Sequence, residues 1–118
     1  MAPQIVQRGP DLPAQARPYR TIGPFDADSI PAGLLLQHEL KAGVWGLLSV
    51  EEGNIRFCWD DQRGGERLLS AGETILIPPA APHHLEREGP VIIALTFCTI
   101  PENRRRLTRS PPLPCCAT

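Results

Sequence analysis

Short apolar runs separated by turn residues dominate the middle of the chain. The segment 54–59, NIRFCW, alternates strictly, so that Ile55, Phe57 and Trp59 share one face of an extended strand. The segment 90–98, PVIIALTFC, is continuous and rich in β-branched residues, which is typical of a strand buried in a sandwich or barrel. Further strands are predicted at 33–40 and 44–53, and as two short strands around Ala71-Gly72.

Turn residues delimit these runs. A Glu-Glu-Gly-Asn turn is expected at 51–54, and a hairpin-like turn rich in Asp and Gly at 60–66. The 14 prolines and 10 glycines supply ample turn chemistry. No segment shows an amphipathic helical stripe of about twelve residues. Several short strands with turns about every 8 to 12 residues predict an all-β sandwich or barrel.

The chain has the length of one domain, at 118 residues. Residues 1–18 contain four prolines and little periodicity, so they are predicted to form an irregular N-terminal arm. From residue 101 the sequence is first arginine-rich and then proline-rich, so 101–118 is predicted to be a flexible tail. The folded domain is therefore expected at 19–100.

The charge balance excludes some classes of partner. Twelve basic and 13 acidic residues give a net charge of −1, which creates no field that would attract nucleic acid or an anionic membrane. No apolar run approaches the roughly 20 residues that span a bilayer, and the N-terminus lacks the apolar stretch of a secretory signal. We expect a cytoplasmic protein with neither nucleic-acid nor membrane partners.

Candidate chemistry is concentrated in residues 72–86, GETILIPPAAPHHLE, which hold two of the three histidines of the chain. Pro78 follows Gly72 after five intervening residues, and His83 follows the double proline and a small residue. This spacing resembles the second motif of the cupin superfamily. In cupins the corresponding histidine is a metal ligand at the mouth of a small β-barrel.

The first cupin motif would lie upstream, where the chain reads HELKAGVWGLLSVEEG over 38–53. His38 matches the first histidine of that motif, but Leu40 stands where the second is usual. Trp45 and Gly46 stand near the expected glutamate. The chain therefore keeps one histidine per motif and lacks two of the usual four ligands.

The segment 26–57 together with IPPAAPHHLE looks like the small TehB/YeaR-like cupin family, and the resemblance covers about residues 18–98. Members occur alone and as the N-terminal domain of some tellurite-resistance methyltransferases, whose second domain has no counterpart in these residues. The resemblance implies a cupin double-stranded β-helix, that is, a jelly-roll barrel, and often a dimer. We therefore expect a homodimer whose ligand is a small molecule or an oxyanion such as tellurite.

The resemblance also implies a site around His38 and His83 that would hold one divalent transition metal, Zn, Fe or Ni. Two imidazoles alone are a poor cage, because protein metal sites generally use three or four protein ligands, or three and a water. Glu86, three residues beyond His83, is the first choice for a third ligand. His84 and Glu39 each follow a candidate ligand directly, so an extended chain turns them to the opposite face. The full set of candidates for the third ligand is Glu86, Glu39, Cys58, Cys98 and His84.

Three functions remain open. The first is a small-ligand or metal-binding cupin, with a role in stress or oxyanion response and a pocket lined by Trp45, Leu40 and Gly46. The second is a metal-dependent cupin enzyme, an oxygenase, isomerase or lyase, in which the metal acts as Lewis acid or oxygen activator. The third is a non-catalytic dimerisation module whose histidines have no ligand. The catalytic residues and the physiological pathway are not predicted.

Overall fold

The computed structural model describes residues 4–6 and 11–101. Its elements confirm an all-β fold with almost no helix. In chain order they are β1 (Gln4–Val6), β2 (Arg17–Asp26), α1 (Ala32–Leu35), β3 (Val44–Trp59), β4 (Glu66–Ser70), β5 (Glu73–Ile77) and β6 (His83–Thr99).

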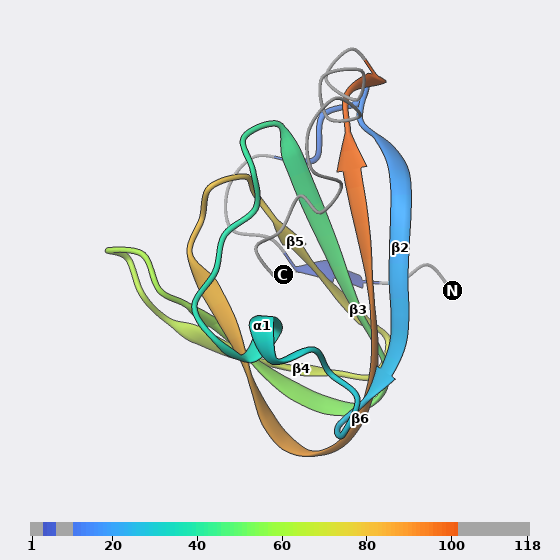
Figure 1. The fold of residues 1–118 in the computed structure, drawn as a ribbon, viewed down its shortest axis with the longest axis vertical. Coiled ribbons are helices and arrows are strands. Elements are labelled where there is room, and N and C mark those ends of the chain that lie inside the picture. The colour runs from blue at the N-terminus through green and yellow to red at the C-terminus, as the bar shows by residue number, and fades with distance from the viewer. Residues whose placement is uncertain (1–3, 7–10, 102–118) are drawn as a thin grey trace.

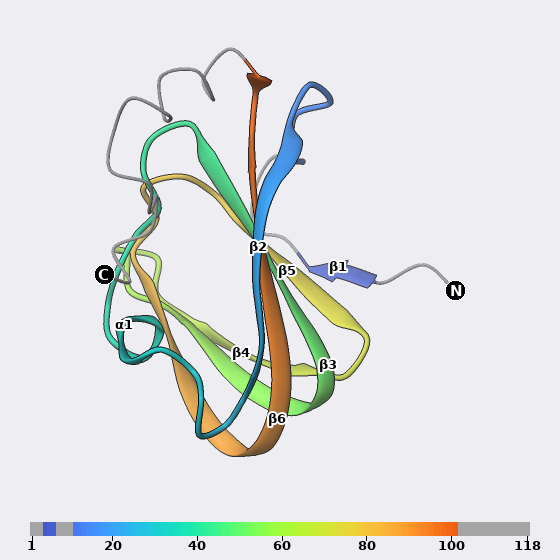
Figure 2. The same cartoon turned by 45° about the vertical axis from the view of Figure 1, so that its right-hand side comes forward.

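Two long antiparallel strands form the frame of the molecule. β3 has 16 residues and β6 has 17, and they pair from Val44 opposite Thr99 to Trp59 opposite His83. Two register shifts lie just before and just after Gly53. Bulges of this kind bend a strand and increase its twist, and both strands are visibly curved (Figures 1 and 2).

Because β3 and β6 curve, each contributes to two layers. In one layer, β6 pairs with β2 and β3 pairs with β5, and β5 pairs in turn with β1 in parallel. In the other layer, the later part of β3 pairs with β4 and with the start of β6. α1 lies on the inner side of the curvature in both views (Figures 1 and 2). The core between the layers consists of apolar side chains, including Leu34, Val44, Leu48, Ile55, Phe57, Ile93, Leu95 and Phe97.

Three sequence predictions need correction. The segment predicted as a strand at 33–40 contains α1 instead, in which Leu34 is 2% exposed while Leu36, just beyond the helix, is 68% exposed. The strands predicted at 44–53 and 54–59 are one strand, because the Glu-Glu-Gly-Asn segment forms a bulge rather than a turn. The arm predicted as irregular includes β1 and the start of β2. All but the first residue of the predicted tail at 101–118 lies outside the described residues.

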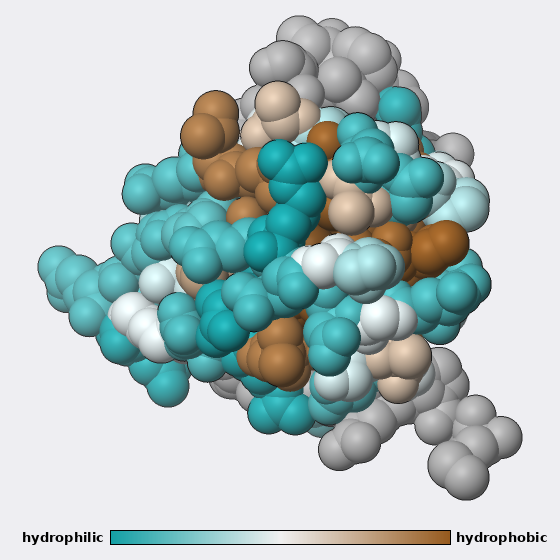
Figure 3. All heavy atoms as spheres, turned by 90° about the horizontal axis from the view of Figure 1, so that it is seen from below, coloured by the Kyte–Doolittle hydropathy of each residue, from teal (hydrophilic) through white to brown (hydrophobic). Residues whose placement is uncertain are grey.

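The surface seen from below carries separate apolar patches among hydrophilic side chains (Figure 3). Leu36 and Leu68 are the large hydrophobic residues exposed on the described part of the chain. Among the described residues, no helix combines the length and the apolar character that crossing a membrane requires.

We predict that Gly53→Ala destabilises the fold much more than Gly72→Ala. Both glycines have positive φ, +72° and +93°, so both substitutions strain the backbone. At position 53, however, the new Cβ would overlap the carbonyl oxygen of Pro90, whereas nothing lies within 4 Å at position 72. We expect Gly53→Ala to lower the unfolding free energy by more than about 3 kcal/mol and Gly72→Ala to lower it by about 1 kcal/mol, as measured by urea denaturation. Equal losses would show that the contact with Pro90 is not what requires glycine.

Candidate functional site

A two-residue backbone bridge brings His38 and His83 together. The amide N–H of His38 donates to the carbonyl oxygen of His83 at 3.0 Å, and the amide of His83 donates back to His38 at 2.9 Å. Residues that exchange both hydrogen bonds in an antiparallel pair face each other and point to the same side. The ring centroids are accordingly 4.3 Å apart, in an edge-to-face arrangement.

Local hydrogen bonds fix the orientation of both rings. Nδ1 of His38 lies 2.8 Å from the carbonyl oxygen of Leu36, and Nδ1 of His83 lies 2.7 Å from that of Ala81. A carbonyl oxygen only accepts, so Nδ1 must carry the proton in both rings. In the neutral rings, each Nε2 therefore keeps a lone pair that can accept a hydrogen bond or bind a metal.

The two histidines line a small, mostly apolar cavity. Its volume is about 10 Å³, close to what one water molecule occupies. His83 is 2% exposed and stacks on Phe57, with ring centroids 5.2 Å apart. Burial lowers the pKa of His83 to about 4, so the ring is neutral near pH 7. The remaining wall consists of aliphatic side chains: Leu34, Leu48, Ile77, Leu85 and Leu95.

The structure does not bring Glu86 to the two histidines. His83 is buried, whereas Glu86 is exposed and its carboxylate lies 2.9 Å from Nε2 of His84. The physical reason is the strand alternation of β6. His84 and Glu86 lie one and three residues beyond His83, both odd steps, so both side chains point to the outer face. The alternation that turns His84 outward therefore turns Glu86 outward as well.

The three predicted pocket residues do not line this cavity either. Leu40 is buried, and its Cδ1 lies 3.1 Å from the place of a Cβ on Gly46, so these two residues pack against each other beside the cavity. Trp45 is only half-buried and lies between Val44 and Gly46 on a strand whose burial alternates, so it points outward. The sequence connected none of the other wall residues, Leu34 and Phe57 among them, to the histidines. The shared face of Phe57 and Trp59 was a usable signal for Phe57.

The inner pair is a poor match for a resident divalent metal. No third histidine, cysteine or carboxylate lines the cavity among the described residues. Two neutral nitrogen ligands in an apolar surrounding leave the charge of a divalent ion uncompensated, and protein sites generally supply at least three ligands. The inner pair instead offers two hydrogen-bond acceptors.

The other face of the same two strands carries a charged cluster. His84 lies opposite Cys58 in the ladder. Its Nδ1 lies 2.7 Å from the carboxylate of Asp60, and its Nε2 lies 2.9 Å from that of Glu86. Hydrogen bonds to the two carboxylates raise the pKa of His84. Burial, and next the charge of Glu86, raise the pKa of the Cys58 thiol to about 11, so this thiol is not a nucleophile at neutral pH.

Two of the solved structures that are similar to this chain illustrate the shared fold. One is a protein from Escherichia coli strain K12, with a TM-score of 0.70 and 22% identity over 79% of this chain and 99% of that one. The other is TehB from Haemophilus influenzae, with a TM-score of 0.74 and 20% identity over 85% of this chain. This chain spans 37% of the length of that TehB chain.

No curated protein matches the chain. The model of the TehB-like domain matches residues 20–95, which include His38, His83, the charged cluster and most of the described fold. This match covers well over half of the sequence. The chain therefore belongs to the TehB-like family.

Proposed function

We propose that this chain is a small-ligand-binding domain in which Nε2 of His38 and Nε2 of His83 accept hydrogen bonds from the ligand. The observation that carries the proposal is the pair of rings fixed by their Nδ1–carbonyl bonds on the wall of an apolar cavity. Ligand sites are typically apolar concavities with a few well-placed polar groups. The inner cavity has this character on a small scale.

The chemistry of the cavity selects the class of ligand. His83 is neutral, and apart from the two imidazoles the wall is apolar, so it contains no lysine or arginine to compensate a buried anion. A bound oxyanion would lose its hydration without gaining a counter-charge. The ligand that fits is small and uncharged, with an N–H or O–H donor at one end and an apolar remainder. An oxyanion response of the kind associated with tellurite would have to act through another part of the molecule.

Entry of anything larger than water requires a movement of Leu34. Leu34 is 2% exposed and forms part of the cavity wall. It belongs to α1, which has only four residues and no side-chain cap at its N-terminus. Such a short helix depends on its packing for stability. Displacement of α1 is therefore the least costly way to enlarge the cavity.

The enzyme alternative has less support, because the inner pair lacks a third ligand for a catalytic metal. The homodimer stays a prediction, which light scattering of the purified protein would test. The exposed side chains of Leu36 and Leu68 are the apolar groups that a partner subunit would cover.

A matched pair of probe molecules tests the proposal. We predict that pyrazole, which carries an N–H donor, raises the thermal stability of the protein and that 1-methylpyrazole, which has none, does not. Ligand that binds only the folded state stabilises it by about 2.7 kcal/mol at a hundredfold excess over Kd. Nitrogen-15 NMR of the histidine rings should show the Nε2 resonances of His38 and His83 shifting with pyrazole alone.

The variant His83→Phe preserves the stack on Phe57 but removes the acceptor, so it should no longer respond to pyrazole. His84→Asn is the control, since it changes the neighbouring residue on the outer face. Equal responses to both probes, or an unchanged response of His83→Phe, would refute the proposed role of the two rings.

Buried His83 also predicts a loss of stability in acid. Its pKa is about 4 in the folded protein against an ordinary 6.5, so the unfolded chain binds more protons between these values. The contribution of neutral His83 to the unfolding free energy is fully present above pH 6.5 and is lost as the pH falls toward 4. Between about pH 7 and pH 5, the wild type should lose about 2 kcal/mol more unfolding free energy than His83→Phe. Urea denaturation of metal-free protein measures this difference, and identical pH dependence of the two proteins would contradict a buried neutral His83.

A further inference from the structure

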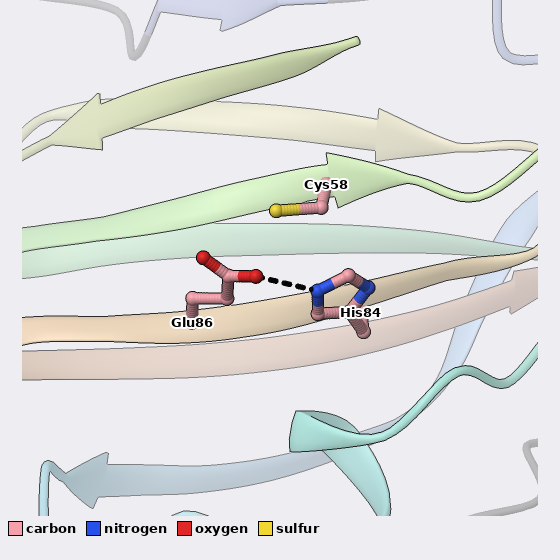
Figure 4. A group of neighbouring side chains, drawn as sticks. All are labelled: Cys58, His84 and Glu86. Carbon is pink, nitrogen blue, oxygen red and sulfur yellow. Dashed lines mark hydrogen bonds and ion pairs between the residues drawn. The ribbon is translucent and has the colours of Figure 1, made fainter. Parts of the chain in front are cut away.

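Three metal-ligating side chains of different kinds meet on the outer face of the β3–β6 ladder. The Sγ of Cys58, a ring nitrogen of His84 and a carboxylate oxygen of Glu86 all lie within 4.8 Å of one another. They come from two adjacent strands: the carboxylate of Glu86 extends toward the ring of His84, and the thiol of Cys58 lies on the neighbouring strand (Figure 4). The group therefore rests on the most extensively paired part of the sheet and not on a loop.

The carboxylate of Asp60, bound to the far nitrogen of His84, makes this cluster resemble a metal site more than a simple ion pair. This carboxylate holds Nδ1 of His84 at 2.7 Å, which leaves Nε2 directed to Glu86 at 2.9 Å. A carboxylate on the far nitrogen of a histidine is the usual second-shell partner of a histidine that binds zinc. It fixes the ring orientation and makes the ligating nitrogen more basic.

We propose that Cys58, His84 and Glu86 bind a zinc ion, or another divalent ion of similar softness, with Asp60 as the residue that positions His84. Zinc accepts thiolate, imidazole and carboxylate together, in a tetrahedral arrangement. Three protein ligands leave the fourth position to water. Glu86 is half-exposed, so that position is open to solvent.

The distances suit such a site after a small adjustment. With zinc–ligand bonds of about 2.0–2.3 Å, tetrahedral ligand atoms lie about 3.4–3.8 Å apart. The hydrogen bond between His84 and Glu86 is shorter than this at 2.9 Å, so the ion would separate the two atoms slightly. Coordination displaces the thiol proton of Cys58 and the proton that Nε2 of His84 shares with Glu86.

The charges around the cluster also favour a cation. The carboxylates of Glu86, Glu66 and Asp60 all act electrostatically on the thiol of Cys58. Arg56, which lies opposite Glu86 in the ladder, is held by Glu66 at 2.8 Å and by Glu88 at 3.0 Å, so its charge is balanced. The outer cluster thus has the thiolate donor and negative charge that the inner cavity lacks. This inference is independent of the proposed small-ligand site.

Cobalt titration of the 118-residue chain tests the site, because a cobalt–thiolate bond gives a charge-transfer absorption in the near ultraviolet. The background should carry Cys115→Ser and Cys116→Ser, so that thiols near the C-terminus cannot produce the signal. We expect one equivalent of Co²⁺ to produce this absorption, and Zn²⁺ to abolish it by displacement. Asp60→Asn should weaken binding about 10- to 100-fold while the absorption band is retained.

Matched substitutions locate the site. Cys58→Ser should remove the thiolate band, whereas Cys98→Ser, at another buried free cysteine, should keep it. Glu86→Gln should weaken Co²⁺ binding, whereas Glu88→Gln, two residues further along the same strand, should not. Circular dichroism confirms that each variant is folded. A band that persists in Cys58→Ser, the absence of any band in the background protein, or its loss in His83→Phe would overturn the proposal.

Discussion

The continuous pairing of β3 with β6 is the constraint on which the rest of the molecule depends. Fourteen residue pairs run from Val44–Thr99 to Trp59–His83, interrupted by the bulges around Gly53. Because of these bulges, two strands bend and supply both layers of the core. The pairing also determines the direction of every side chain near both sites. His83 lies opposite Trp59 and faces inward, and His84 lies opposite Cys58 and faces outward.

One step along the chain therefore separates two chemical environments. On the inner face, burial keeps His83 neutral, and its polar neighbours are a backbone carbonyl and another imidazole. On the outer face, carboxylates surround His84 and favour its charged form. The same kind of side chain is thus a neutral hydrogen-bond acceptor at His83 and a partner of carboxylates at His84. The difference arises from sheet geometry and not from the local sequence.

Periodicity predicted the residues of β3, β4 and β5 and the second half of β6 as strand, but it did not predict β1, β2 or the bends. The relation between His38 and His83 came from the cupin resemblance. A glycine at position 53 is compatible with a bulge and with a turn, because both use positive φ. Only the closeness of Gly53 to Pro90 in the folded chain shows that it forms a bulge. The run 33–40 is too short for periodicity to separate a strand from a helical turn. The prediction of Glu86 as a third ligand is a different case, because the sequence alone argues against it. Positions 83 and 86 differ by an odd number, so alternation along a strand turns their side chains to opposite faces.

Leu40 connects these observations. The resemblance places it where cupins usually have a second histidine, and the structure packs it against Gly46, where even a Cβ would be in tight contact with it, at 3.1 Å. A leucine at this place removes one inner ligand and fills the space beside the cavity with hydrocarbon. The apolar interior then favours the neutral form of His83 and disfavours a divalent ion. Of the five candidates for a third ligand, Cys58, His84 and Glu86 gather on the opposite face, where solvent and carboxylates can compensate a cation. Strand alternation, and not Leu40, places these three side chains outside, whereas Leu40 leaves the inner face without a further ligand.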